Sequence, residues 1–158
     1  MRLVSFKADD GARIGLVKAD KVIDLTSVDK TAPRDIQAVI ASGKLGALQA
    51  IADKASDTDF LNFDTLTFNI PISAPGKILC LGLNYMEHVN EGMFEKQPFP
   101  AIFIRTATSM VAHKAPVIRP VKSETLDFEA ELALIIGTQS LAKGQTTGWS
   151  IRITRSIA

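Results

Sequence analysis

The sequence lacks the features that mark several specialised classes of protein. Cys80 is the only cysteine among the 158 residues, so no internal disulfide framework can form. Lysine and arginine total 18 against 17 for aspartate and glutamate, which is not the basic excess of a nucleic-acid or membrane-surface partner. The apolar runs fall far short of the roughly 20 residues that a membrane span needs. We therefore expect no nucleic-acid partner and no membrane segment.

No signal peptide is visible at the N-terminus. Residues 1–11 are charged and contain no apolar stretch of the kind found in a signal peptide. The chain has no internal repeat and no low-complexity segment, and its hydrophobic fraction of 46% is sufficient for a core. These features together predict a cytoplasmic protein.

The first 30 residues show β-strand patterning. Three short apolar runs, residues 3–6, 13–17 and 21–25, are separated by Asp10-Gly11 and by Ala19-Asp20. An Asp-Gly pair between β-prone runs is a strong local signal for a hairpin turn. The segment therefore predicts consecutive antiparallel strands.

Helical spacing follows from residue 33 onward. Apolar residues recur at helical intervals over residues 33–40, with Pro33 suited to the first turn and Gly43 to a C-terminal cap. A second helix is expected where Leu45, Leu48 and Ile51 share a face. A further strand is expected at residues 65–68.

Pro71, Pro75 and Gly76 mark a domain boundary. We expect a small domain of hairpins and helices at residues 1–72 and a second domain at residues 73–158. The second domain is predicted to be rich in strands, at residues 77–81, 101–104, 115–118 and 126–136. The fold class is therefore α+β, with a small N-terminal α/β domain.

The longest of these predicted strands is acidic at one end. Side chains alternate between the faces of a strand, so Asp127, Glu129 and Glu131 would share one face, which Ala133 and Ile135 continue as apolar residues. Carboxylates about 6.7 Å apart and partly desolvated require a cation or a proton. Mg²⁺ or Mn²⁺ would satisfy that need. The alternative is an exposed strand whose acids face water.

A second chemical pattern lies between residues 79 and 91. An apolar strand ends at Gly82, and Asn84 with Glu87 resembles a capping box that opens a helix. His88 and Glu91 would then lie on one helical face, within hydrogen-bonding reach. A carboxylate that holds one imidazole nitrogen leaves the other free to accept a proton from water. The alternative is a surface His–Glu pair.

Together these blocks resemble the fumarylacetoacetate hydrolase family. The resemblance runs from Lys77 through the Leu-Asn-Tyr and His-x-x-Glu segment to Pro100-Ala101-Ile102-Phe103. It continues through Ser109, Pro116 and Pro120 to residues 126–137. It covers roughly 60 residues in unbroken order, and residues 1–72 match the family's small N-terminal domain more loosely.

The resemblance implies a mixed β-roll catalytic domain that binds one divalent ion and forms a homodimer. It places Glu129 and Glu131 in the shell of a Mg²⁺ or Mn²⁺ ion and makes His88 with Glu91 the pair that activates water. Arg105 and Tyr85 would bind substrate. Such enzymes act on 2-oxo or diketo acids by C–C hydrolysis, decarboxylation or keto–enol isomerisation.

The sequence departs from the family pattern at two places. Arg105 stands where many members carry lysine, although arginine can still bind a carboxylate through two hydrogen bonds. Residues 138–158 contain no aspartate or glutamate, whereas the family pattern supplies its third metal carboxylate downstream of this point. A truncated or frameshifted product would have this sequence. A catalytically inactive remnant or assembly subunit of the same fold therefore stays an alternative.

Self-association of the isolated chain is the testable consequence of this reading. Apolar side chains of the acidic segment, Phe128, Leu132, Leu134 and Ile136, each represent about 1.5–3 kcal/mol of burial, and without later strands they would stay exposed. We expect oligomers or aggregates with little turnover. Sedimentation velocity together with an assay in the presence of a divalent ion measures both. A stable monomer with ordinary turnover would contradict the expectation.

Overall fold

The computed structural model describes residues 1–85, 90, 99–126, 131–137 and 151–153. The chain divides into two compact units: residues 1–72 with 111–158 form one, and residues 73–110 form the other. Strands and a few short helices make up the described part, in agreement with the α+β class. The domain division predicted at residue 72 with a second domain to residue 158 stays a prediction.

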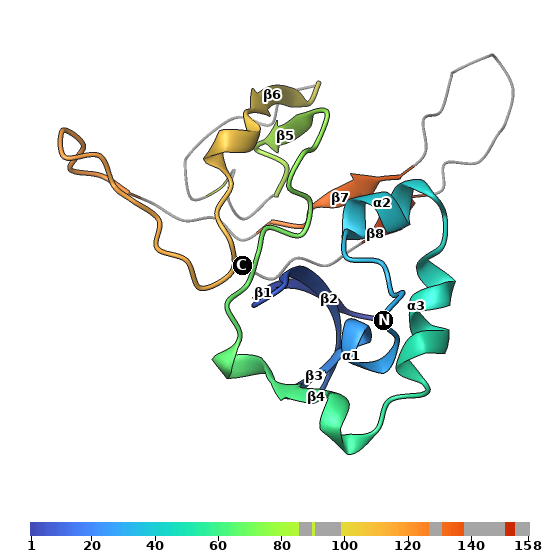
Figure 1. Ribbon diagram of the computed structural model, residues 1–158. Helices are drawn as coiled ribbons and strands as arrows, with labels where there is room; N and C mark the ends of the chain where they lie inside the picture. The colour runs from blue at the N-terminus through green and yellow to red at the C-terminus, as the bar shows by residue number, and fades with distance from the viewer. Residues whose placement is uncertain (86–89, 91–98, 127–130, 138–150, 154–158) are drawn as a thin grey trace, which may run out of the picture. The chain divides into compact units, whose positions relative to one another are not determined.

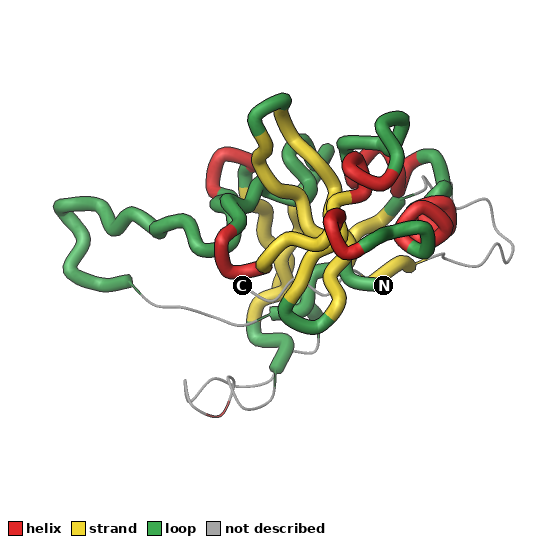
Figure 2. The backbone as a smooth tube through the Cα atoms, turned by 60° about the horizontal axis from the view of Figure 1, so that its bottom comes forward, coloured by secondary structure: helices red, strands yellow, loops and turns green. Residues whose placement is uncertain are grey.

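The first unit is built on a four-stranded antiparallel sheet (Figure 2). Its strands lie in the order β1 (Leu3–Ala8), β2 (Gly11–Lys18), β3 (Lys21–Asp24) and β4 (Phe60–Asn62). The first three are the strands that the apolar runs predict, and the two turns lie where expected. Gly11 adopts a φ of 114° after the first turn, a conformation that glycine takes without strain.

Three helices pack on this sheet: α1 (Leu25–Val28), α2 (Ile36–Ala41) and α3 (Leu45–Ala52) (Figure 1). The two helices expected from the spacing are confirmed. Pro33 does not lie in the first turn of α2, because Asp35 caps that helix by accepting a hydrogen bond from the Gln37 backbone N–H at 2.8 Å. Gly43 follows the C-cap of α2 with a φ of 68°, as predicted for a left-handed cap.

The core of this unit lies between the sheet and the helices. Its buried members come from β2, β3 and all three helices, with Ala32 from the connection between α1 and α2. They are Ile14, Leu16, Ile23, Leu25, Ala32, Ile36, Val39, Ile40, Leu48 and Ala52. The spacing of Leu45, Leu48 and Ile51 therefore identified the correct face of α3, with Leu48 fully buried and the other two packed at the edge.

The strand expected at residues 65–68 is wrong. Residues 63–65 form a short 3-10 helix, η2 (Phe63–Thr65), and the pairing strand is β4, immediately before it. Phe68 makes only an isolated antiparallel bridge with Phe6 of β1. Two flanking backbone hydrogen bonds, Lys7 N–H to Thr67 O and Asn69 N–H to Ser5 O, still fasten this segment to β1 at 2.8 Å each.

The second unit contains one described hairpin. Strand β5 (Ile78–Gly82) pairs antiparallel with β6 (Ala101–Arg105), and both were predicted. A short 3-10 helix, η3 (Ala107–Ser109), follows β6. One face of the hairpin carries Leu79, Leu81, Ile102 and Ile104, all of them exposed. Among the described residues, this unit therefore has no buried apolar core of its own.

The predicted strands beyond residue 110 are largely wrong. Residues 115–118 form no strand, and Pro116 has no backbone N–H to donate to a neighbour. Among the described residues of the strand expected at 126–136, β7 (Leu134–Ile136) alone is a strand, and it pairs with β8 (Ile151–Ile153); residues 127–130 lie outside the described part. Within the described residues, no helix is long and apolar enough to cross a membrane.

The buried carboxylate of Asp59 joins α1 to the segment that follows α3. Asp59, in the short 3-10 helix η1 (Asp57–Asp59), accepts a hydrogen bond from the Ser27 hydroxyl of α1. It also accepts hydrogen bonds from the Ser56 backbone N–H at 2.9 Å and from the Ser56 hydroxyl at 2.8 Å. These donors, Ser27 foremost, lower the pKa of Asp59 below its ordinary value of 3.8.

The stability of this unit should depend on pH through Asp59. A depressed pKa stabilises the folded state at neutral pH, and the contribution is lost as pH falls below about 4 toward the folded-state pKa. We expect Asp59→Asn to lower the free energy of unfolding at pH 6 and to flatten its decline towards pH 3. Urea unfolding at both pH values measures this. Asp57→Asn, in the same short helix, is the control; equal pH dependence in the two variants would contradict the assignment.

Candidate active-site residues

Four of the predicted site residues belong to the unit formed by residues 73–110, and the structure describes two of them, Arg105 and Tyr85. Arg105 is the last residue of β6, and its side chain is exposed. Tyr85 follows the end of β5 by three residues and is 42% exposed. Between the end of β5 and Tyr85, Leu83 adopts a φ of 54°, so the chain turns sharply where it leaves the strand.

The register of the hairpin separates the attachment points of these two residues. Arg105 pairs with Ile78 at the start of β5, whereas the segment that leads to Tyr85 leaves from Gly82, which pairs with Ala101. Four residues at about 3.3 Å each separate the two ends of the strand, or about 13 Å. The hairpin alone therefore does not place the two backbones side by side.

Glu131 is described, and its surroundings differ from the expectation. The residue is exposed and lies three positions before β7, outside any strand. The argument that alternation places Glu129 and Glu131 on one face of a strand therefore does not hold for the described end of this segment. Its exposed carboxylate is nonetheless accessible to a dissolved ion.

The remaining predicted residues, His88, Glu91 and Glu129, lie outside the described residues, as does the expected helix from Asn84 except at residues 84, 85 and 90. Among the residues that the structure does describe, no group of three or more His, Cys, Asp or Glu side chains could hold a metal ion. The metal shell and the His–Glu pair stay predictions.

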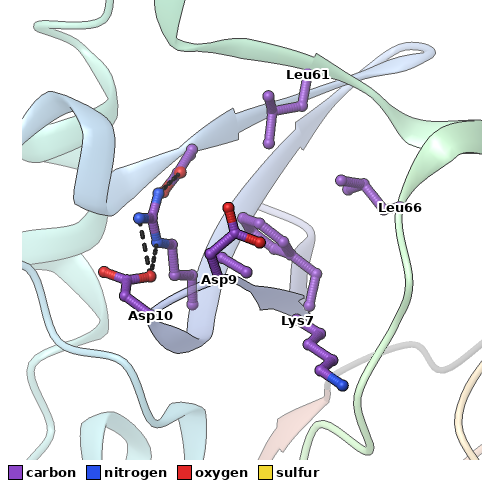
Figure 3. A pocket seen from close by; sticks show the side chains of 9 residues that line it. Lys7, Asp9, Asp10, Leu61 and Leu66 are labelled. Atoms are coloured by element: carbon purple, nitrogen blue, oxygen red, sulfur yellow. Dashed lines mark hydrogen bonds and ion pairs between the residues drawn. The ribbon is translucent and has the colours of Figure 1, made fainter.

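A surface pocket of ≈ 410 Å³ lies on the N-terminal sheet and contains none of these residues. Apolar side chains from β4 and the segment after it, Leu61 and Leu66, lie across it from Asp10 (Figure 3). Arg13 and Asp24 also line it. The pocket was not foreseen, because Asp10-Gly11 was interpreted only as a turn signal.

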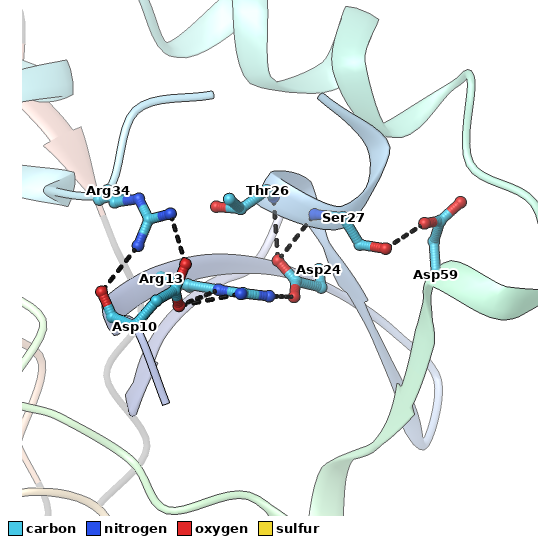
Figure 4. Close-up of polar contacts among 7 residues, drawn as sticks. All are labelled: Asp10, Arg13, Asp24, Thr26, Ser27, Arg34 and Asp59. Carbon is cyan, nitrogen blue, oxygen red and sulfur yellow. Dashed lines mark hydrogen bonds and ion pairs between the residues drawn. The ribbon is translucent and has the colours of Figure 1, made fainter. Parts of the chain in front are cut away.

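Three of the charged residues that line this pocket, Asp10, Arg13 and Asp24, form one ion-pair network (Figure 4). Arg13 donates from Nε to Asp10 at 2.9 Å and from Nη1 to buried Asp24, while its Nη2 lies 2.9 Å from Asp10. Hydrogen bonds from Arg34 and then Arg13 lower the pKa of Asp10 to about 2. The hydrogen bond to Asp24 raises the pKa of Arg13. All three guanidinium nitrogens are thus engaged, and the network is structural in character.

An aromatic cluster joins residue 113 to the segment that follows β4. The ring of His113 lies 5.9 Å from that of Phe63 and 5.0 Å from that of Phe68, edge to face. The two phenylalanine rings lie 4.9 Å apart. Each such pair contributes about 0.5–1.5 kcal/mol beyond the area it buries. His113 is exposed, and it also makes these ring contacts.

The comparisons with known proteins bear on residues 77–146. This stretch matches the family model described as the C-terminal domain of fumarylacetoacetate (FAA) hydrolase. A mitochondrial oxaloacetate tautomerase of Xenopus laevis is 34% identical over 141 residues, and one of Homo sapiens is 33% identical over the same length. Over this stretch the chain resembles the fumarylacetoacetate hydrolase family. It spans less than half the length of these relatives, 44% and 45%, while 87% of the chain itself is aligned.

Solved structures of the family share the fold. The fumarylacetoacetate hydrolase from Exiguobacterium antarcticum superposes with a TM-score of 0.61 at 28% identity, over 87% of this chain and 47% of that one. The maleylpyruvate hydrolase from Sphingobium sp. SYK-6, in complex with manganese (II) and pyruvate, superposes with a TM-score of 0.59 at 24% identity. That alignment covers 87% of this chain and 49% of the other. The resemblance inferred from the sequence blocks is therefore confirmed at the level of family and fold.

Proposed function

We propose that this chain provides residues of a divalent-metal-dependent active site that acts on 2-oxo or diketo acids. The observation that carries the proposal is the family match over residues 77–146. All six predicted site residues fall inside that stretch: Tyr85, His88, Glu91, Arg105, Glu129 and Glu131. A mixed β-roll is the arrangement that would gather them.

The donor chemistry suits a hard divalent ion. Glu129 and Glu131 offer carboxylate oxygens, the ligands that Mg²⁺ and Mn²⁺ prefer. Glu131 is exposed, so its carboxylate requires no rearrangement of a core to reach an ion. When bound, such an ion would polarise the carbonyl of an oxo acid and stabilise an enolate. The manganese and pyruvate bound to the maleylpyruvate hydrolase of the same fold are in line with this chemistry.

The remaining residues would handle the proton and the substrate carboxylate. Glu91 would accept a hydrogen bond from one imidazole nitrogen of His88, so that the other nitrogen takes a proton from water or from the substrate. Arg105 has a planar guanidinium that donates two parallel hydrogen bonds to a carboxylate. Its exposure at the end of β6 leaves it open to such a ligand. The Tyr85 hydroxyl is a second polar contact for the substrate.

Two reaction types fit these residues. Hydrolysis of a C–C bond in an acylpyruvate-like acid needs an activated water, whereas keto–enol isomerisation needs only proton transfer at the carbon beside the carbonyl. The names of the relatives that are 33–34% identical, oxaloacetate tautomerases, favour isomerisation as the second candidate. Analysis of the products separates the two, because enol oxaloacetate is converted to its keto form without a cleavage product, whereas hydrolysis of an acylpyruvate yields two acids.

Metal binding is the first test of the proposal. We expect Mn²⁺ to bind the chain weakly, with water in the positions that the two glutamates do not fill, since such ions keep several waters. Isothermal titration calorimetry of the wild type and of the double variant Glu129→Gln with Glu131→Gln measures this. Glu124→Gln, an exposed glutamate of the same segment, is the control. Equal heats for the double variant and the wild type would remove the metal site.

Proton transfer is the second test. With an oxaloacetate or acylpyruvate substrate and Mn²⁺, we expect His88→Ala to lower kcat by about 10²–10⁴-fold, the usual effect of removing a general base. Glu91→Gln should lower kcat less, because it orients the imidazole without carrying the proton. Steady-state kinetics of the three proteins measure this. Full kcat in His88→Ala would show that another group moves the proton, and the absence of turnover in the wild type would favour the inactive alternative.

A further inference from the structure

After residues 73–110 the chain makes a tight turn whose two central side chains contact the segment that follows β4. The Ala115 backbone N–H donates to the Ala112 carbonyl oxygen at 3.0 Å, which closes a four-residue turn. His113 and Lys114 are the two central residues of this turn. Both belong to the same compact unit as the N-terminal sheet.

Lys114 occupies a position that normally belongs to glycine. Its φ is 63°, in the left-handed region, and it stands third in the turn. Turns that require a positive φ at this position select glycine or asparagine, because a Cβ atom is strained there. A lysine persists in such a conformation where surrounding contacts hold it. The lysine side chain must therefore offset a cost that glycine would avoid.

Two side-chain contacts hold Lys114 in this conformation. Its Nζ lies 2.7 Å from an Asp64 carboxylate oxygen and 5.6 Å from the centre of the Phe63 ring. The hydrogen bond from Lys114 lowers the pKa of Asp64. Because Lys114 and Asp64 are both largely exposed, salt screens this pair, and the ring contacts of His113 carry the rest of the attachment.

The partner surface is itself fixed to the sheet. Phe68 is only 7% exposed and bridges to Phe6 of β1, while the Phe63 backbone N–H donates to the Asp20 carbonyl oxygen at 3.1 Å. The chain therefore leaves the N-terminal sheet beside Phe68 and returns against the same ring at His113. The two stretches of the first unit that flank residues 73–110 therefore meet in one small aromatic cluster.

We propose that the 112–115 turn is a clasp that fastens the returning chain to the N-terminal unit. In doing so it fixes the start of the segment that leads to Glu131. His113 and Lys114 are then positioning residues, which act through the aromatic cluster and Asp64. That second role rests on the proposed function, because it gives the N-terminal unit a part in holding a metal-binding segment. The clasp itself stands on the contacts alone.

The sharpest test of the clasp is Lys114→Gly, for which two explanations predict opposite signs. If the lysine side chain did nothing, glycine would relieve the strained φ and slow the exchange of the Ala115 amide hydrogen. The clasp predicts faster exchange. His113→Ala should also speed the exchange of the Ala115 amide hydrogen. His113→Phe should return the exchange to the wild-type rate, since only an aromatic ring is required. Lys122→Gly, in an exposed turn of the same segment without a positive φ, is the control.

Hydrogen exchange and Mn²⁺ titration of the full chain together decide the outcome. Unchanged or slower exchange in Lys114→Gly, or failure of His113→Phe to restore protection, would overturn the clasp. We further expect His113→Ala to weaken Mn²⁺ binding by about 2- to 30-fold, the range of couplings between linked sites, with recovery in His113→Phe. A wild type that binds Mn²⁺ and a His113→Ala variant with the same affinity would overturn the positioning role. A wild type that binds no Mn²⁺ would contradict the proposed function, while exchange still decides the clasp.

Discussion

The carboxylate of Asp24 is the contact on which the N-terminal unit depends. It ends β3, accepts hydrogen bonds from the Thr26 and Ser27 backbone N–H groups to cap α1, and pairs with Arg13 of β2. A single buried group therefore sets the strand end, the helix start and the cross-strand ion pair. Such a charge is tolerated in a core only because these donors replace water. This cap fixes where α1, the first of the helices that cover the sheet, begins.

The elements that could be predicted from the sequence are those that local signals determine. The first three strands and the helices α2 and α3 follow from local signals, turn residues and apolar spacing, that act within a few positions. The strand expected at residues 65–68 failed because strand formation requires a partner. β4 pairs with β3, and residues 67–69 contact β1 only through one isolated bridge and its two flanking hydrogen bonds. Arg13 and Asp24, 11 residues apart, gave no local signal of their contact.

The candidate site divides in another way between what was and was not predictable. Its residues were identified through the order of several blocks over residues 77–137, and the family match over 77–146 supports that route. Strand alternation, a purely local argument, predicted the site less well. The acidic segment was interpreted as one long strand, yet β7 begins only at Leu134 and pairs over three residues with β8. Alternation predicts a shared face only where a strand forms, so the proposed pairing of Glu129 with Glu131 rests on the resemblance.

The buried core and the proposed site therefore lie in different segments of this chain. The described apolar residues that are fully or nearly buried come from residues 6–68, whereas the family-matched segment exposes Leu79, Ile102, Ile104 and Leu132. The described residues of this segment bury too little apolar surface to fix the geometry of a site by their own packing, since burial of apolar surface is the main favourable term in folding. Its order must come from contacts with something better packed. Within the described residues, the ring cluster at Phe63, Phe68 and His113 is a contact of that kind.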